Sequence, residues 1–150
     1  MFGIEEKVWR EKNGLNTANE IYQQPELWLE TVGIIEKNKE DIIKFFNGFE
    51  KSKNTRIIFT GAGTSAYVGD VAVPYLNSKY DYRFEAIPTT DIVTNPKEYL
   101  EPDTTTILVS FARSGHSPES IATYNLAEKI VKNINHVFIT CNPNGEMAKL

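Results

Sequence analysis

Two loops in the sequence combine glycines with hydroxyl side chains of the kind that bind phosphate. The glycine loop, residues 61–66, reads Gly-Ala-Gly-Thr-Ser-Ala, and the serine loop spans residues 110–120. An apolar run of strand type precedes each loop, and a helical pattern follows it. Free N–H groups at a helix start, the positive end of the helix dipole and short hydroxyls form an anion site that needs no lysine. The two loops therefore predict a site for a small phosphorylated, polyhydroxylated ligand.

The glycine loop also fits the dinucleotide pattern G-x-G-x-x-G/A between a strand and a helix. That pattern requires an acidic residue at the tip of the second strand, where it binds the ribose. The sole candidate, Glu85, lies inside the expected strand 83–87, and the tip reads Ile-Pro-Thr-Thr. No Gly-Lys-Ser/Thr follows the glycines, so a P-loop is excluded. A nicotinamide-dinucleotide site therefore ranks third among the hypotheses.

Each loop also has a purely structural explanation. Ser117 and Pro118 are typical of an N-cap and a first helical position, and a glycine run can simply form a tight turn. Two such loops at successive strand ends favour binding over either explanation alone. We expect His116 to be an exposed loop residue, His136 to be structural at the start of a strand, and Cys141 to be a small core residue.

The elements that must position these loops follow from the hydrophobic pattern. Residues 1–53 show helical periodicity, with a polar interruption at 38–40, and form an N-terminal helical segment. Residues 54–150 alternate strand and helix patterns, which predicts an α/β lobe with a doubly wound, flavodoxin-like parallel sheet. The expected strands are 56–60, 83–87, 106–111 and 136–141. Four strands are few for such a sheet, and 142–150 resemble a loop and a first helical turn, so we expect a truncated lobe.

Composition removes several classes of function. The 150 residues carry 16 Lys and Arg against 20 Asp and Glu, a net charge of −4, which argues against a nucleic-acid partner. No apolar run approaches the length of a membrane span, and the charged N-terminus lacks the apolar region of a signal peptide. One cysteine and two distant histidines make no disulfide and a poor metal set. We expect a cytoplasmic protein without a metal ion.

Together the two loops resemble the sugar isomerase (SIS) domain. Within it they are similar to the group of tagatose-6-phosphate ketose/aldose isomerases and galactosamine-6-phosphate deaminase/isomerases. The resemblance covers nearly the entire chain, and the motifs that carry it are residues 61–65, 110–120, 89–91, 141–143 and, in the N-terminal helices, 24–28. It implies an SIS fold preceded by helices.

The resemblance also implies which residues bind the substrate. Thr64 and Ser65 match the first substrate loop, and the hydroxyls of Ser114 and Ser117 match those that hold the sugar phosphate. The full implied set is Gly63, Thr64, Ser65, Arg113, Ser114, Gly115 and Ser117. Proteins of this group typically have two SIS lobes, and the general acid and base come from the second lobe and the tail beyond it, so no catalytic residue is assigned here.

The leading hypothesis is the phosphate-binding lobe of an aldose–ketose isomerase or deaminase. It would act on a hexose or hexosamine 6-phosphate of the tagatose or galactosamine type, with no cofactor. Its partners would be the small-molecule sugar phosphate and further copies of itself in a homo-oligomer, with no nucleic acid and no membrane. The alternative is a non-catalytic regulatory domain that binds a sugar phosphate.

Overall fold

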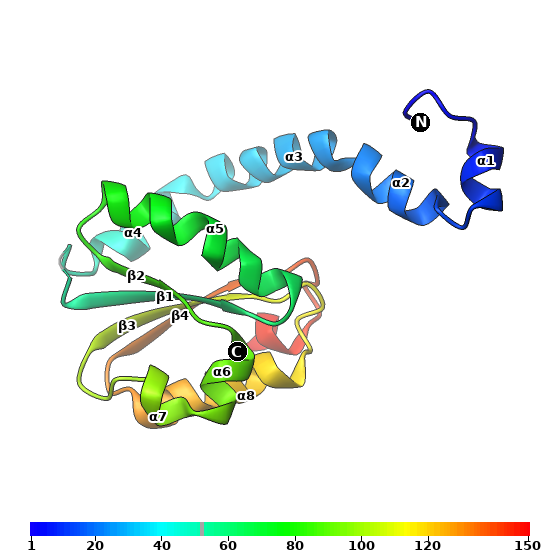
Figure 1. Cartoon of the computed structure of the whole chain (residues 1–150). Coiled ribbons are helices and arrows are strands. Elements are labelled where there is room, and N and C mark those ends of the chain that lie inside the picture. The colour runs from blue at the N-terminus through cyan, green and yellow to red at the C-terminus, as the bar shows by residue number, and fades with distance from the viewer. Residues whose placement is uncertain (52) are drawn as a thin grey trace. The chain divides into compact units, whose positions relative to one another are not determined.

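A computed structural model describes residues 1–51 and 53–150 of the chain. The chain divides into two compact units, Met1–Gly48 and Phe49–Leu150. Each unit has its own secondary structure, which Figure 1 labels along the chain. We describe the units separately.

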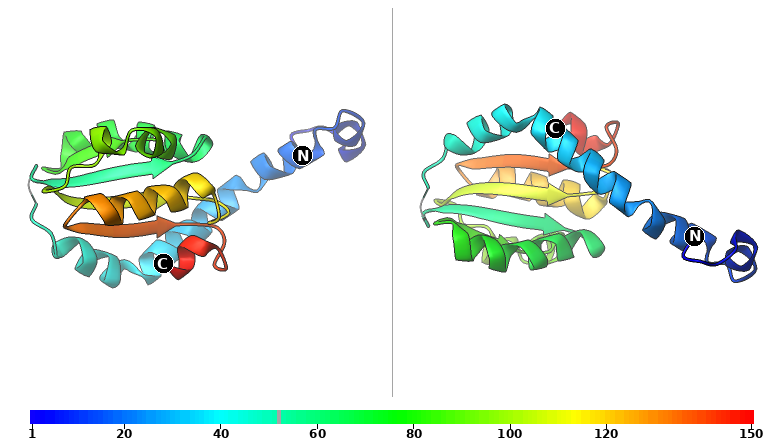
Figure 2. Two further views of the ribbon diagram at one scale, coloured as in Figure 1. Left: turned by 90° about the horizontal axis from the view of Figure 1, so that it is seen from below. Right: turned by 90° about the horizontal axis from the view of Figure 1, so that it is seen from above.

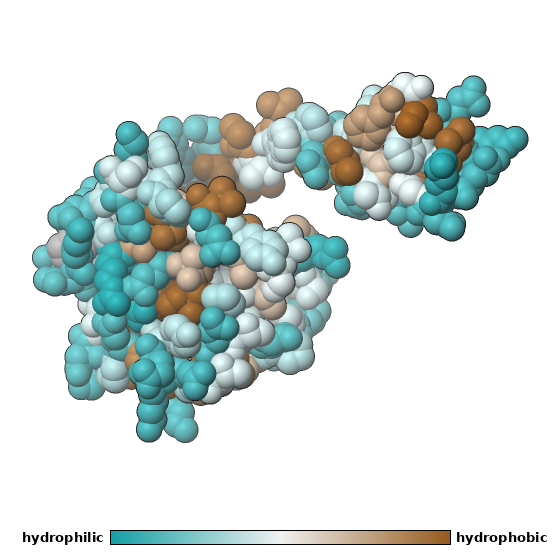
Figure 3. Space-filling view, in the orientation of Figure 1, coloured by the Kyte–Doolittle hydropathy of each residue, from teal (hydrophilic) through white to brown (hydrophobic). Residues whose placement is uncertain are grey.

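The first unit is helical throughout. The polar interruption predicted at 38–40 separates two of its helices, and Asn38 lies between them with its side-chain amide donating to the carbonyl of Ile34 (2.8 Å). Trp28 is 63% exposed, and apolar side chains are visible on the surface of this unit in Figure 3. The helices are α1 Glu6–Glu11, α2 Leu15–Tyr22, α3 Gln24–Lys37 and α4 Lys39–Asn47.

The second unit is built on a parallel sheet of four strands. Their order is β2-β1-β3-β4, and both views of Figure 2 show the arrowheads at the same end of the sheet. The two central strands are buried along almost their whole length, as the β-branched and apolar runs require of a parallel sheet. The predicted doubly wound sheet is confirmed. The strands are β1 Thr55–Gly61, β2 Arg83–Ala86, β3 Thr105–Phe111 and β4 Ile134–Ile139.

The last strand differs from its prediction by two residues. It begins at Ile134, which pairs with Thr106, and ends at Ile139. The chain then leaves the sheet, and the Thr140 hydroxyl accepts a hydrogen bond from the backbone N–H of Asn142 (3.1 Å). Cys141 is exposed for this reason. The prediction of a small core residue at this position is wrong.

Helices cover both faces of the sheet within this unit. Helix α5, Thr64–Lys79, lies over one face, and α6, Thr89–Thr94, α7, Pro96–Tyr99, and α8, Pro118–Ile130, lie over the other (Figure 1). A 3₁₀ turn, Glu146–Lys149, follows the last strand. The core lies between the sheet and the second group of helices, and its fully buried members include Ile58, Ile92, Leu108 and Ala127.

The strand order creates a topological switch point between β1 and β3. From β1 the chain crosses to β2 on one side, and from β3 it crosses to β4 on the other. The two strands are paired along their length, with Gly61 opposite Phe111 at their carboxyl ends. Ligands of open α/β sheets bind in the crevice that such diverging connections leave. The glycine and serine loops both begin at this crevice.

Candidate functional site

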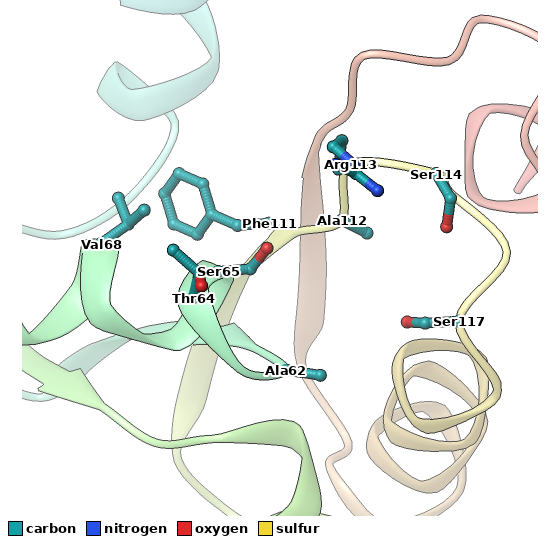
Figure 4. Close-up of a pocket in the computed structure, with 9 residues that line it drawn as sticks. All are labelled: Ala62, Thr64, Ser65, Val68, Phe111, Ala112, Arg113, Ser114 and Ser117. Atoms are coloured by element: carbon teal, nitrogen blue, oxygen red, sulfur yellow. The ribbon is translucent and has the colours of Figure 1, made fainter. Parts of the chain in front are cut away.

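A cavity of about 610 Å³ lies between the glycine loop and the serine loop. Figure 4 shows the hydroxyls of Ser114 and Ser117 facing the space between the loops, with Ser65 on the opposite side. Five of the seven predicted site residues line the cavity, while Gly63 and Gly115 shape the loops without lining it. The lining residues are Ala62, Thr64, Ser65, Val68, Phe111, Ala112, Arg113, Ser114 and Ser117.

The glycine loop brings the start of α5 close to the end of β1. A Cβ atom on Gly61 would lie 2.7 Å from the backbone carbon of Ser65, so the helix could not begin here if the strand ended in a larger residue. Gly63 is the N-cap of α5 and has φ +57°, a conformation that glycine adopts without strain. These two glycines place Thr64 and Ser65 at the cavity.

The serine loop turns the chain from β3 into α8. Ser117 occupies the N-cap position and Pro118 the first helical position, as the sequence predicts. The Ser117 hydroxyl does not cap the helix, since it donates to the hydroxyl of the buried Ser120 (2.5 Å). The Ser114 hydroxyl accepts a hydrogen bond from the backbone N–H of His116 (3.3 Å). The Ser114 hydroxyl therefore keeps its proton for donation to a ligand, and the Ser117 hydroxyl can donate to one when its bond with Ser120 reverses and Ser120 becomes the donor.

Arg113 is the single ionisable residue among the described residues that line the cavity. It is exposed, and within the described part of the chain its guanidinium forms no ion pair. A guanidinium presents several donors in a planar fork that matches the geometry of a phosphate. The cavity therefore combines one unpaired positive charge with a set of hydroxyls.

Glu85, the candidate ribose acid of the dinucleotide hypothesis, is held elsewhere. Its carboxylate pairs with the buried Arg56, whose Nη2 lies 2.5 Å from Oε2, and with Arg83, whose Nε lies 2.5 Å from Oε1. Arg83 also hydrogen-bonds Glu101, which lowers the pKa of that carboxyl. Arg56 stands near the start of β1, at the opposite end of the strand from the cavity. This ion-pair network, which the sequence did not reveal, is a structural link between β1 and β2.

Neither histidine lines the cavity. His116 is exposed in the serine loop, and its Nδ1 accepts a hydrogen bond from the backbone N–H of Glu146 (3.4 Å). His136 lies on β4 against α8, with Nε2 3.0 Å from Oε1 of Glu128. Within the described residues, no three His, Cys, Asp or Glu side chains are grouped as metal ligands.

One contact of the serine loop was missed at the sequence level. Residues 140–147, which follow β4, lie against the loop, and the Asn142 side-chain amide donates to the carbonyl of Ser114 (2.9 Å). The motif at 141–143 pointed to this segment, but its residue types did not indicate which part of the chain it contacts.

The described residues include no helix with the length and apolarity of a membrane span.

The fold and the two loops define the class of protein. The profile of the SIS domain matches residues 50–150, which include the sheet, both loops and every residue that lines the cavity. The chain belongs to the SIS domain family.

Particular relatives share most of this chain. It is 43% identical over 134 residues to the D-galactosamine-6-phosphate deaminase AgaS of Escherichia coli, an alignment that covers 89% of this chain and 35% of that protein. The solved tagatose-6-phosphate ketose/aldose isomerase of E. coli superposes with a TM-score of 0.81 at 40% identity, covering 87% of this chain and 36% of its own. A Clostridium novyi NT structure, to which the same isomerase name is given provisionally, reaches a TM-score of 0.90 at 50% identity, with 97% and 37% covered. The chain spans about a third of the length of these relatives.

Proposed function

We propose that this chain supplies the phosphate-binding lobe of a sugar-phosphate isomerase or deaminase. The substrate would be a hexose or hexosamine 6-phosphate of the tagatose or galactosamine type, the sugars for which its relatives are named. The observation that carries the proposal is the cavity at the switch point, where hydroxyls from two adjacent loops face a common space with the unpaired Arg113.

The substrate-binding roles are assigned from this geometry. Arg113 supplies the charge that attracts the phosphate, and the hydroxyls of Ser114 and Ser117 hydrogen-bond its oxygens. Thr64 and Ser65, on the facing loop, line the same cavity and would hydrogen-bond the sugar hydroxyls. Gly63 and Gly115 give the loops the backbone conformations that place these groups, since both have positive φ.

The lining also supports a binding role rather than a proton-transfer role for this lobe. Moving a proton between two carbons beside a carbonyl needs a carboxylate, an imidazole or a similar base within hydrogen-bond reach. The lining residues include no carboxylate and no imidazole. A catalytic base would therefore come from outside this set of residues.

Removing either serine hydroxyl tests phosphate binding. Ser114→Ala or Ser117→Ala should weaken the binding of galactosamine 6-phosphate by about 1–3 kcal/mol, the range for hydrogen bonds to a charged group. Calorimetry on the protein at its natural length measures this directly. Ser78→Ala is the matched control, because Ser78 is exposed on α5 and its hydroxyl donates to the carbonyl of Tyr75. Equal affinity of the unchanged protein for galactosamine and its 6-phosphate would contradict the proposal.

A regulatory domain that binds a sugar phosphate without chemistry is the second candidate, and the lining without a base favours it. Turnover of galactosamine 6-phosphate or tagatose 6-phosphate by the protein at its natural length separates the two.

A dinucleotide site is tested by thermal denaturation. Millimolar hexose 6-phosphate should raise the melting temperature by mass action, whereas NAD should give no saturable shift because Glu85 is engaged with Arg56. A rise in melting temperature with NAD but not with hexose 6-phosphate would favour the dinucleotide site over the sugar-phosphate site.

A further inference from the structure

The 140–147 segment forms hydrogen bonds to four consecutive residues of the serine loop. Three of the acceptors are backbone carbonyls and the fourth is an imidazole nitrogen. The pairs are the Thr140 hydroxyl to Arg113 O (3.4 Å), Asn142 Nδ2 to Ser114 O (2.9 Å), Met147 N to Gly115 O (3.0 Å) and Glu146 N to His116 Nδ1 (3.4 Å).

The backbones of the two segments touch at a pair of glycines. A Cβ atom on Gly145 would lie 2.9 Å from the Cα of Gly115 and 3.0 Å from the carbonyl oxygen of Ser114. A Cβ atom on Gly115 would lie 3.1 Å from the Cα of Gly145. Met147 is fully buried beside them. The segment is thus fitted to the loop and leaves no room for movement of the loop carbonyls toward it.

The segment lies behind the loop with respect to the cavity. Arg113 and Ser114 line the cavity, while all the lining residues come from 62–117 and none from 140–147. The carbonyl and the N–H of one trans peptide point in opposite directions. Because the carbonyl of Arg113 faces the segment, the N–H of Ser114 faces away from it, and within the described part of the chain this N–H has no partner.

The direction of these carbonyls matters for an anion. A carbonyl dipole directed at a phosphate repels it, whereas N–H groups and hydroxyls attract it. Asn142 is itself held in place, since its Oδ1 accepts from the backbone N–H of Asn144 (3.0 Å) and its own N–H donates to Thr140 (3.1 Å). It can therefore fix the peptide between Ser114 and Gly115, while Thr140 bonds the preceding peptide, which carries the Ser114 N–H.

We propose that Asn142, supported by Thr140, is a positioning residue for phosphate binding. Thr140 holds the Arg113 carbonyl, on the peptide that carries the Ser114 N–H, and Asn142 holds the Ser114 carbonyl of the next peptide, so that the Ser114 N–H and hydroxyl remain directed to the cavity. This inference rests on the proposed function, because it presupposes that the serine loop binds the phosphate.

Two substitutions and two controls test the inference in the protein at its natural length. Asn142→Ala removes the bond to Ser114, and Thr140→Val removes the bond to Arg113 with little change in shape. Thr140→Ser keeps the hydroxyl. Asn144→Ala keeps the backbone N–H that Asn142 accepts, and its side chain is exposed in the same turn. None of these changes alters the charge near the anion.

Calorimetry with galactosamine 6-phosphate and with inorganic phosphate gives the readout. Asn142→Ala and Thr140→Val should each raise Kd about threefold to tenfold, as expected for one neutral hydrogen bond, while Thr140→Ser and Asn144→Ala should bind as the unchanged protein does. In a turnover assay KM should rise with kcat unchanged. A merely structural role would lower the fraction of protein that binds and leave Kd where it was.

The outcomes separate this inference from the proposed function. If the unchanged protein binds phosphate but both substitutions leave Kd unchanged, Asn142 is not a positioning residue and the proposed function stands. If the unchanged protein shows no preference for the phosphorylated sugar, the proposed function fails and this inference fails with it. Should Asn142→Ala not fold, the comparison of Thr140→Val with Thr140→Ser decides, and equal Kd values for that pair would overturn the inference.

Discussion

The imidazole of His136 lies in an apolar setting between β4 and α8. Its ring stacks on Phe138 at 5.7 Å and meets the ring of Tyr124 at 4.6 Å. Nε2 contacts Glu128, and within the described part of the chain the buried Nδ1 has no partner. Burial lowers the pKa of His136 below its ordinary value, and the nearby carboxylate of Glu128 offsets part of that effect. Folding therefore favours the neutral ring.

This setting predicts a stability that depends on pH. Between the lowered pKa of the folded state and the ordinary value near 6.5, the unfolded chain binds a proton that the folded chain does not. The free energy of unfolding should fall as the pH drops through this window. His136→Gln, which keeps a donor for Glu128 but does not titrate, should remove that part of the pH dependence in urea unfolding.

A second substitution should strengthen the pH dependence of stability, whereas His136→Gln should weaken it. Glu128→Gln removes the carboxylate that raises the pKa of His136, so the loss of stability on acidification should become larger. Equal slopes of unfolding free energy against pH for the unchanged protein and His136→Gln would show that this histidine is not the group responsible.

At the level of elements, the junction of β1 and α5 depends on one glycine. Gly61→Ala would push a methyl group into the backbone of Ser65 and displace the start of the helix. We expect a loss of about 1–3 kcal/mol in unfolding free energy, the usual cost of overpacking, together with weaker phosphate binding. Denaturant unfolding and calorimetry measure the two effects.

Gly33 provides the matched control for this change. It lies inside α3, and apart from its chain neighbours and the backbone of its own helix no described atom lies within 4 Å of the position its Cβ would take. Gly33→Ala should therefore stabilise the helix by roughly 0.5–1 kcal/mol through propensity alone. If both alanine substitutions had the same effect, close approach at Gly61 would not be the cause.

Most elements of the second unit were predictable because their signals are local. β1, β2 and β3 coincide with the expected runs to within a residue, since each is a short run that contains β-branched or aromatic residues of strand type. The pairing of β1 with β3 needed the structure, because no local pattern records which strands are neighbours. Once this pairing is known, it follows that Thr64 and Ser65 lie across the cavity from Ser114 and Ser117.

The features that the sequence did not predict correctly involve residues whose partners are distant in the chain. The exposure of Cys141 depends on where β4 leaves the sheet, which is set by pairing with β3. The bond from Asn142 to Ser114 joins residues 28 apart. Ser117 was correctly placed as an N-cap, yet its hydroxyl bonds Ser120, because the sequence fixes the position of a cap and not the rotamer of its side chain.

For the whole molecule, the notable surface feature is the amount of apolar side chain left exposed on each unit. On α3 the exposed residues include Trp28 and Leu29, and on α5 a stripe at helical spacing contains Tyr67, Val71 and Tyr75. Val71 is 80% exposed. Isolated apolar side chains on a surface are ordinary, but a stripe of this kind marks a surface that packs against another one.

We therefore expect the 150-residue polypeptide to self-associate. We also expect it to show no isomerase or deaminase turnover, since the described cavity lining lacks a general base. Sedimentation over a range of concentrations and a coupled assay on tagatose 6-phosphate and galactosamine 6-phosphate check both statements. A monomer that converts either sugar would direct the search for a base to Asp91, His116 or Glu119 of this chain.

The order of the chain gives the 140–147 segment a consequence during protein synthesis. Both loops that line the cavity leave the ribosome before this segment does, and Asn142 follows Ser114 by 28 residues. Until then the Ser114 carbonyl lacks its bond to Asn142, so under the proposed function the nascent site would bind a sugar phosphate more weakly than the finished one. Ligand binding stabilises a folded state by an amount that grows with the logarithm of the ligand concentration divided by Kd. A sugar phosphate would thus assist the last steps of folding on the ribosome, and the early ones hardly at all.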